Sequence, residues 1–243
     1  MFRGMTLRGR MLSTGLALLL VPLAVIFGVV VVSQVRMREA TSQEVRKLAV
    51  QDLDHLVQGI EAMCLTQQAV LEDAVIDGLA VTRATLARTG APTLGSETVS
   101  WSAVNQLTKT ASTVDLPRLM AGETWLGQNA EIATPSPVVD EVRDLIGGTA
   151  TIFQRMNDSG DMLRVCTNVQ SKDGKRAIGT FIPATNPDGQ PNPVLKSVLA
   201  GQVYRGRAFV VDRWYVTAYE PIRNAVGTIV GMNRRGPLPG AAA

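Results

Sequence analysis

A long apolar run near the start of the chain is the strongest pattern in the sequence. Residues 11–32 contain no charged side chain, and three arginines precede them. About 20 apolar residues, rising about 1.5 Å each, suffice to cross the hydrocarbon core of a bilayer. Because basic residues stay on the cytoplasmic side, the pattern predicts a cytoplasmic segment at 1–10 and a transmembrane helix at 11–35. The rest of the chain then lies outside the cytoplasm.

A cleaved signal peptide is the alternative reading of the same run, since it also begins with basic residues. The run is longer than the apolar region of an ordinary signal peptide, and no Ala-x-Ala cleavage site follows it. These two observations favour a retained anchor. Either reading sends residues 36–243 to the same side of the membrane.

A second helical pattern follows the apolar run directly. Residues 36–89 contain no proline, and Leu53, Leu56, Ile60 and Met63 recur at spacings of three and four. This period predicts a long amphipathic helix with one narrow apolar stripe. Such a stripe packs on its own domain, on a twin helix, or on both, so we expect a homodimer through this helix.

The middle of the chain is predicted to be helical. Gly90, Ala91 and Pro92 end the long helix, and the spacing of apolar residues over 96–107 predicts a short helix with a Ser or Thr cap. A second short helix is predicted over 138–146, where Gly147 and Gly148 stop it.

Strand patterns replace the helical ones after Gly148. Two strands, ATIFQRMN and DMLRVCTNV, are predicted to form a hairpin, and AIGTFI adds a further strand. A short helix, VLKSVLAG, precedes three more strands: RGRAFVVD, WYVTAYEPIR and TIVGMN. The tail at 233–243 has neither period and is predicted to be disordered. The fold class is therefore α+β, with about five antiparallel strands in a sensor-like layout.

Composition excludes several classes of function. The 24 basic and 21 acidic residues are mixed along the chain, which argues against a nucleic-acid-binding surface. One histidine and two cysteines without a CxxC motif argue against a metal site. Cys64 and Cys166 are expected to be unpaired, buried thiols, although a disulfide between them stays possible in an oxidising compartment. No nucleophile–base pair or phosphate loop is recognisable, so we expect no catalytic residues, no cofactor and no enzymatic activity.

Candidate binding residues lie on the late strands. An arginine grips a carboxylate with two hydrogen bonds, and aromatic side chains supply an apolar floor with polar tips. Strand alternation puts one set, Tyr215 and Tyr219, on one face of their strand, and a second set, which includes Arg207, on one face of the preceding strand. Core packing or a solvated face is the usual role of each such residue, and the identity of the concave face decides between the sets. The ligand-binding candidates, in order, are Arg207, Tyr215, Tyr219, Trp214, Arg164 and Arg155.

Four segments of the chain together resemble one known family. They read PVVDEVRDLIGGTATIFQRMN, GDMLRVCTNVQ, DGKRAIGTFIPATNPDGQPNPV and YRGRAFVVDRWYVTAYEPIRNAVGTIVGM. They resemble the Cache 3/Cache 2 fusion type of single Cache domain, and WSAVNQLTKTASTVDLPRLMAGETWLGQN is similar to its helical portion. The likeness extends from about residue 36 to Met232 and involves several motifs in order.

The resemblance implies a function outside the cytoplasm. Such domains resemble the sensors of methyl-accepting chemotaxis proteins and, less often, of histidine kinases. The implied fold has a long N-terminal helix and a PAS-like curved antiparallel sheet, with a small metabolite, often an organic acid, on the concave face. We therefore expect a single-pass protein of the bacterial inner (plasma) membrane, with a periplasmic or extracellular sensor domain at 36–232. A histidine kinase or cyclase sensor without its output part, or a nonfunctional receptor remnant, remains an alternative.

One departure from the family pattern follows Met232. The family continues into a second transmembrane helix and a cytoplasmic signalling part, whereas this sequence reads NRRGPLPGAAA. No second apolar run of about 18 residues follows. The resemblance thus leads us to expect a receptor truncated before its second transmembrane helix.

Overall fold

The computed structural model describes residues 7–237 and forms two compact units, residues 1–64 and residues 65–243. Helix α1 (Leu7–Thr89) contributes to both units. Residues 1–6 of the predicted cytoplasmic segment and 238–243 of the predicted tail lie outside the described residues.

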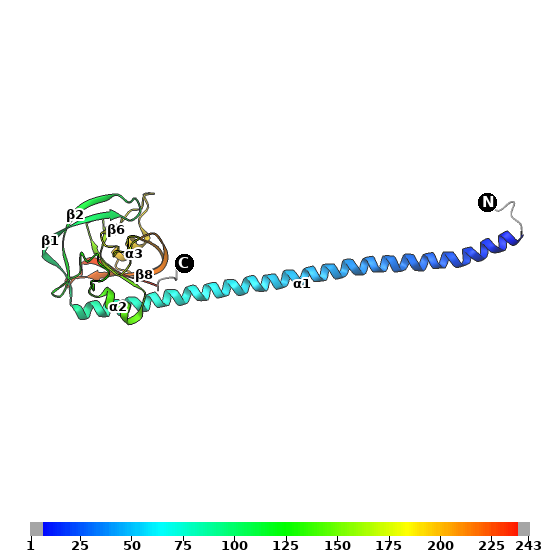
Figure 1. Cartoon of the computed structure of the whole chain (residues 1–243), viewed down its shortest axis with the longest axis horizontal. Helices are drawn as coiled ribbons and strands as arrows, with labels where there is room; N and C mark the ends of the chain where they lie inside the picture. Colours follow the sequence, from blue (N-terminus) through cyan, green and yellow to red (C-terminus); the bar gives the residue numbers. More distant parts are fainter. Residues whose placement is uncertain (1–6, 238–243) are drawn as a thin grey trace. The chain divides into compact units, whose positions relative to one another are not determined.

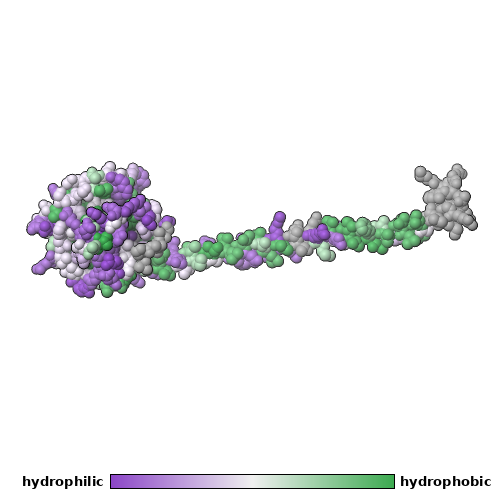
Figure 2. All heavy atoms as spheres, viewed as in Figure 1, coloured by the Kyte–Doolittle hydropathy of each residue, from purple (hydrophilic) through white to green (hydrophobic). Residues whose placement is uncertain are grey.

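The first unit consists of the leading part of α1. Its stretch Leu18–Arg38 has a mean hydropathy of 2.6, and the protein covers none of it. Within residues 7–237, this is the one stretch of helix that is long and apolar enough to cross a membrane. Figure 2 shows apolar side chains gathered along this part of the helix. The predicted N-terminal apolar helix is therefore present.

A further set of apolar side chains in this unit is also uncovered. Leu53, Leu56, Ile60 and Met63 are all exposed. They recur at the spacing that places them on one side of a helix, so the predicted stripe exists on the folded chain.

The second unit is built on a curved, mixed sheet (Figure 1). In the described part of the chain, the sheet contains nine strands in the order β3-β2-β1-β6-β5-β4-β9-β8-β7. The pairing of β1 with β6 is parallel, and the other pairings are antiparallel. The strands are β1 (Pro92–Asn105), β2 (Ala111–Ala121), β3 (Thr124–Trp125), β4 (Thr149–Arg155), β5 (Met162–Thr167), β6 (Thr180–Ile182), β7 (Tyr204–Val210), β8 (Arg213–Arg223) and β9 (Ile229–Gly236).

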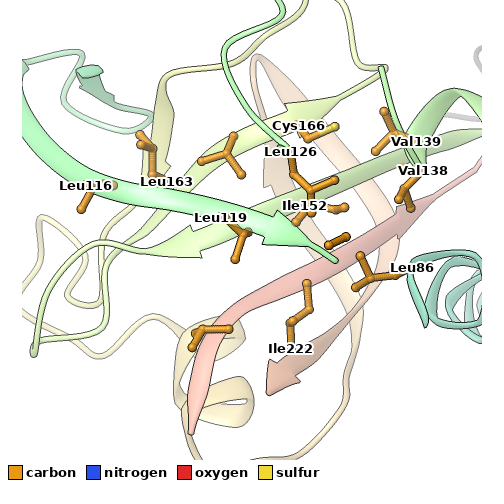
Figure 3. Packing of buried hydrophobic residues seen from close by; sticks show 14 of the residues in the cluster. Leu86, Leu116, Leu119, Leu126, Val138, Val139, Ile152, Leu163, Cys166 and Ile222 are labelled. Carbon is orange, nitrogen blue, oxygen red and sulfur yellow. The ribbon is translucent and has the colours of Figure 1, made fainter. Parts of the chain in front are cut away.

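Three helices cover the sheet. The last turns of α1 place Leu86 in a core with α2 (Val139–Ile146) and with β1, β2, β4 and β5 (Figure 3). On the other face, α3 (Pro193–Leu199) packs through Leu195 against Phe153 and Tyr219. Because each face of the sheet buries its own apolar cluster, the strands read as nearly continuous buried runs.

The end of α1 is also tied to the sheet by polar contacts. Arg83 Nη1 lies 2.8 Å from the Glu220 carboxylate on β8, and the Asn233 side chain donates to the same carboxylate at 2.8 Å. Gly78 lies under the side chain of Arg235, where a Cβ atom would come within 2.5 Å of Arg235 Nε. This glycine therefore permits a close approach between helix and strand.

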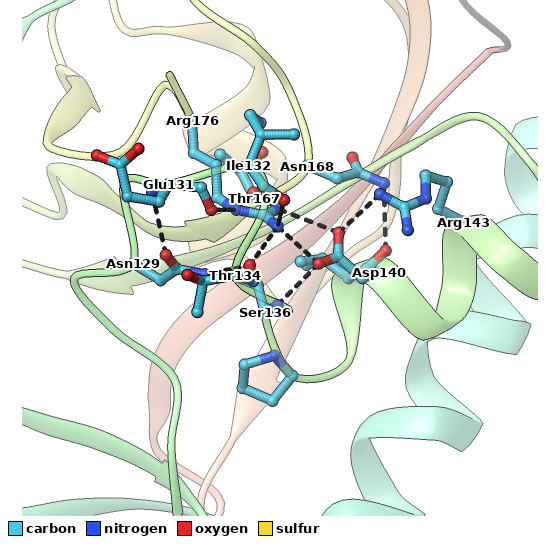
Figure 4. A network of polar contacts seen from close by, with 12 residues as sticks. Asn129, Glu131, Ile132, Thr134, Ser136, Asp140, Arg143, Thr167, Asn168 and Arg176 are labelled. Carbon is cyan, nitrogen blue, oxygen red and sulfur yellow. Dashed lines mark hydrogen bonds and ion pairs between the residues drawn. The ribbon is translucent and has the colours of Figure 1, made fainter. Parts of the chain in front are cut away.

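A buried ion pair holds the segment between β3 and α2 (Figure 4). Arg176 is 3% exposed, and its guanidinium grips the Asp140 carboxylate with hydrogen bonds of 3.0 and 2.7 Å. The guanidinium also donates to four backbone carbonyls, so its donors are well satisfied. These carbonyls belong to Glu131, Ile132, Thr134 and Thr167.

The α+β class, the long helix, both later short helices and the strand segments predicted after Gly148 are confirmed. The sheet has nine strands in the described residues rather than about five, and it is mixed rather than purely antiparallel, because β1, β2 and β3 come from the region predicted to be helical. The short helix predicted over 96–107 is wrong, because those residues lie in the long β1–β2 hairpin and its turn. Trp101 and Ala103 are buried there, while Ser100 and Ser102 are exposed. This alternation has the period of a strand and was masked by apolar residues that also fit a helix.

Two smaller expectations also need correction. The predicted tail does not begin at Asn233, because β9 continues through Gly236. Arg234 and Arg235 are buried, and each guanidinium donates at least one hydrogen bond to a neighbouring element. Both cysteines are free, as expected, but only Cys166 is buried, and Cys64 is exposed on α1.

Candidate functional site

A cavity of about 610 Å³ lies on the α3 side of the sheet. Its walls come from the β1–β2 turn, the segment between β6 and α3, and the β7–β8 hairpin. Tyr219 and Ile182 contribute to its lining from the sheet itself. A cavity of this size suits a small metabolite. The remaining lining residues are Gln106, Leu107, Lys109, Asn186, Pro187, Asp188, Asn192, Pro193, Val194, Arg207, Ala208, Phe209 and Trp214.

The two turns at the cavity are joined to each other. Lys109 Nζ donates to the Gln106 carbonyl at 2.7 Å and to the Val211 carbonyl at 3.4 Å. Lys109 and Val211 both adopt positive φ angles, 62° and 60°. These are uncommon conformations for residues with a Cβ atom, most of all for a β-branched one. The β1–β2 turn and the β7–β8 turn, each with one strained residue, thus form the rim of the cavity, where they contact each other.

An unsatisfied acceptor borders the cavity. Gln106 is 4% exposed, and its Nε2 donates to the Phe209 carbonyl at 3.5 Å. Its Oε1 is buried and has no hydrogen-bond partner among the described residues. A buried carbonyl without a donor costs free energy, and a ligand that carries a hydroxyl or an ammonium group would remove that cost.

Aromatic rings line the inner and outer ends of the cavity. Tyr219 is 1% exposed, and its ring lies 6.3 Å from that of Phe153 and 6.2 Å from that of Tyr204. Trp214 is 53% exposed and meets Phe209 edge-on, with ring centroids 6.0 Å apart. The cavity therefore passes from a buried tyrosine to a solvent-accessible tryptophan.

Two buried arginines lie on the same face of the sheet as Tyr219. Arg164 and Arg234 are each 1% exposed, and in the described part of the chain neither forms an ion pair with a carboxylate. Arg164 Nη1 donates to Thr180 Oγ1 at 2.7 Å, and its guanidinium lies 5.2 Å from the Phe153 ring centre. Arg234 Nε donates to Thr217 Oγ1 at 3.0 Å.

The charges of these arginines raise the local potential. Burial, together with repulsion from Arg234, lowers the pKa of Arg164 to about 10. Burial also lowers the pKa of Arg234, against the opposing effect of Tyr219 and Tyr215. Burial raises the pKa of the Tyr219 hydroxyl, against the attraction of the two arginines. At neutral pH both guanidinium groups are charged and the tyrosine is neutral. Neither guanidinium has a carboxylate partner among the described residues, so negative charge is favoured beside them.

The predicted site residues are separated by the strand register. Arg207 pairs with Val216, whereas Tyr204 and Ala208 pair with Tyr219 and Tyr215. Arg207 therefore starts from the opposite face of the sheet to the two tyrosines.

Three of the six candidates nevertheless border the cavity, namely Arg207, Trp214 and Tyr219. Tyr215 lies under the guanidinium of Arg234, 5.9 Å from the ring centre, and Arg164 lies on the same face behind Tyr219. Arg155 is elsewhere, because it donates to the Asn157 and Asp158 carbonyls and closes the β4–β5 turn.

Sequence reasoning missed Gln106, Lys109 and Arg234. Gln106 belongs to the helix predicted over 96–107, Lys109 follows it, and Arg234 belongs to the predicted tail. The alternation of Ser100, Trp101 and Ser102 is the signal that could have found the first hairpin. In residues 7–237 no group of three His, Cys, Asp or Glu side chains is placed to hold a metal ion.

The sequence was compared with family models, curated proteins and solved structures. A family model described as the Cache 3/Cache 2 fusion domain matches residues 38–233. Neither the curated proteins nor the solved structures gave a match. The matched range contains the whole sheet up to Asn233 and every residue that lines the cavity.

Proposed function

The chain belongs to the Cache 3/Cache 2 fusion domain family, and on this premise we propose that it is the ligand-sensing part of a membrane-anchored bacterial chemoreceptor. A Cache domain is a small-molecule sensor that lies outside the cytoplasm. The finer proposal is that the ligand is a small organic anion and that the chain acts in chemotaxis, without catalysis. Its location would be the inner (plasma) membrane, with residues 36–232 in the periplasm or outside the cell.

The observation that carries this proposal is the cavity on the α3 side of the sheet. Lys109 and Arg207 border it, and the guanidinium groups of Arg164 and Arg234, which have no carboxylate partner among the described residues, lie behind its tyrosine. A low-dielectric wall strengthens the attraction of such charges for an anion. The unpaired oxygen of Gln106 further favours a ligand that has a hydroxyl or amino group in addition to its carboxylate.

The ligand proposal is tested by calorimetric titration of the full chain in detergent micelles with hydroxy, amino and unsubstituted carboxylates. We expect saturable binding of a hydroxy or amino acid. Lys109→Met should weaken it about tenfold, because the variant removes a charge at the cavity. Lys196→Met removes the same charge from the exposed side of α3, outside the cavity, and should leave the affinity unchanged. Equal affinities in both variants, or no binding across the panel, contradict the proposal.

Family membership supports a histidine kinase or cyclase sensor as well as a chemoreceptor sensor. The ligand cavity would serve each of them in the same way, so binding data do not separate the classes. The coding sequence beside this one in the genome does, since a methylated signalling hairpin, a kinase or a cyclase there identifies the output. A kinase or cyclase would overturn the chemotaxis part of the proposal and leave the sensor part standing.

Homodimerisation through α1 forms part of the proposal. It is supported by the exposed apolar residues Leu53, Leu56, Ile60 and Met63, which follow the spacing of a two-stranded coiled coil. In a Cys64→Ser background, Met63→Cys should cross-link two copies rapidly on mild oxidation. Gln58→Cys, which lies on the opposite side of the helix, should not. Equal cross-linking at both positions, or none at Met63→Cys, contradicts a dimer of this geometry.

The orientation of the anchor is tested separately. Alkaline phosphatase matures only where its disulfides can form, so a fusion after Cys64 should be active if the unit that follows is outside the cytoplasm. An inactive fusion that is present at normal abundance contradicts the proposed orientation.

A further inference from the structure

A second cavity, of about 300 Å³, lies on the other side of the sheet from the first, against α1. Its lining is largely apolar and comes from α1, from the end of α2 and from the end of β9. Six of its lining residues carry the argument: Ala74, Asp77, Gly78, Ile146, Gly148 and Arg235.

Arg235 is the cation of this cavity and lacks partners for part of its guanidinium. The residue is 4% exposed, and its Nη2 donates to the Gly147 carbonyl. Its Nε and Nη1 are buried and have no hydrogen-bond partner among the described residues. An ionised donor that is taken out of water without an acceptor is strongly unfavourable, and an anion at this position would remove the penalty.

The fold makes room for this guanidinium with two glycines. A Cβ atom at Gly78 would lie 2.5 Å from Arg235 Nε, and one at Gly148 would lie 2.9 Å from Arg235 Nη2. Asp77 borders the same cavity but forms no ion pair with Arg235 within the described residues. The guanidinium is thus held in place by the backbone, while no carboxylate among the described residues neutralises its charge.

Arg235 remains charged at neutral pH. Burial and repulsion from the neighbouring Arg234 lower its pKa to about 10, which is still well above neutrality. Strand alternation directs Arg234 towards Tyr215 on the α3 side of the sheet and Arg235 towards α1. The two cavities are therefore separated by the sheet and are formed by different side chains.

We propose that the cavity beside α1 is a second ligand site, which binds a small monocarboxylate. The carboxylate accepts a hydrogen bond from the unpaired Nη1 of Arg235, and a short alkyl chain lies among the apolar residues of α1 and α2. The site is independent of the first cavity and of the ligand proposed there. Because α1 forms one of its walls, the bound molecule joins the helix to the sheet and stabilises that docking.

The test is a calorimetric titration of the full chain, in detergent micelles, with sodium propionate. We expect saturable binding that Arg235→Met weakens at least tenfold. Arg205→Met is the matched control, because Arg205 is an exposed arginine near α1 that lies outside the cavity. It should leave propionate binding unchanged, as should Lys109→Met in the first cavity.

A second variant protects the test against misfolding of Arg235→Met. Ala74 is exposed on α1 and borders the cavity, so Ala74→Trp fills the space and leaves Arg235 intact. Propionate binding should be lost in this variant too. The proposal is overturned if the parent chain does not bind propionate saturably, if Ala74→Trp binds it normally, or if Lys109→Met abolishes binding. The last result would assign propionate to the first cavity and leave the proposed sensor function intact.

Discussion

Single residues determine how the rim of the first cavity is held. Val211 adopts a φ angle of 60°, in a region where a β-branched side chain is disfavoured. Lys109 Nζ reaches its carbonyl at 3.4 Å, and Asp212 N–H donates to the Val210 carbonyl at 2.7 Å. The turn is therefore maintained by contacts around it and against the local preference of the residue.

Replacing Val211 by glycine should relieve this strain. We expect Val211→Gly to raise the free energy of unfolding by about 1 kcal/mol, since a left-handed conformation costs a residue with a Cβ atom roughly that much. Chemical denaturation measures the change. Val226→Gly is the control in another exposed turn without a positive φ angle, and it should not stabilise the chain. A loss of stability in Val211→Gly would show that the valine side chain contributes more than its backbone costs.

The Arg176–Asp140 pair gives a second prediction at this scale. Asp140→Asn leaves a guanidinium that is 97% buried without its counter-charge, and we expect it to lower the free energy of unfolding by about 3 kcal/mol. Asp144→Asn, on the exposed side of the same helix, should change stability by no more than about 0.5 kcal/mol. Denaturation of both variants at neutral pH measures the difference, and equal stabilities would contradict a structural role for the pair.

The same pair predicts how stability depends on pH. Burial alone would raise the pKa of Asp140, but hydrogen bonds from Arg176 and the Ser136 N–H, together with the charges of Arg176 and Arg143, outweigh it and lower the pKa. The stabilisation is present above the usual aspartate pKa of about 3.9 and is lost as the pH falls through the lower folded value. Asp140→Asn should therefore abolish this part of the acid destabilisation, as denaturation at a series of pH values would measure.

At the scale of elements, the docking of α1 depends on Gly78. Glycine is normally a weak helix former, and its replacement by alanine stabilises an exposed helix by up to about 1 kcal/mol. Gly59 has nothing within 4 Å of its potential Cβ, whereas Gly78 faces Arg235 at 2.5 Å. The same substitution should therefore have opposite effects at the two positions.

We expect Gly59→Ala to slow amide hydrogen exchange in its part of α1. Gly78→Ala should accelerate exchange in the last turns of α1 and lower the melting temperature. In an Arg235→Ala background, the penalty of Gly78→Ala should disappear, because the contact that forbids the methyl group is gone. A penalty that persists there would assign it to another neighbour.

The elements were predictable where one period dominates the sequence. The stripe of α1 repeats over many turns, and the hairpin of β4 and β5 shows a clear turn between two apolar runs. The β1–β2 hairpin was not predictable in the same way, because Val99 and Trp101 have the spacing of a strand, whereas Trp101 and Val104 have the spacing of a helix. The parallel pairing of β1 with β6 joins residues far apart in sequence, and local patterns carry no information about it.

At the scale of the whole molecule, the two cysteines report on folding from different units. Cys64 is exposed on α1, whereas burial raises the pKa of Cys166 to about 12. A thiol reagent at neutral pH should modify one cysteine per native chain and the second only on unfolding, since the thiolate is the reactive form. Mass spectrometry of labelled peptides measures this. Modification of Cys166 in the native chain would contradict its burial.

The candidate site was partly predictable from the sequence. Arg207, Trp214 and Tyr219 border the first cavity, as chemistry-bearing residues on the late strands suggested. Strand alternation alone could not place Arg207 relative to the tyrosines, because the faces of two paired strands are related only through their register. Lys109 and Gln106 lie at the cavity because the sheet is curved, and no local sequence pattern predicts that curvature.

The contact between Lys109 and the Val211 carbonyl joins segments about a hundred residues apart in the chain. One wall of the cavity comes from the β1–β2 turn and another from the β7–β8 hairpin, so the cavity forms only when the whole sheet has folded. The proposed ligand site is therefore a property of the finished fold, and a fragment that stops before β8 should lack it. An anion bound between the two turns would link them directly, and its binding would stabilise the whole sheet against local opening.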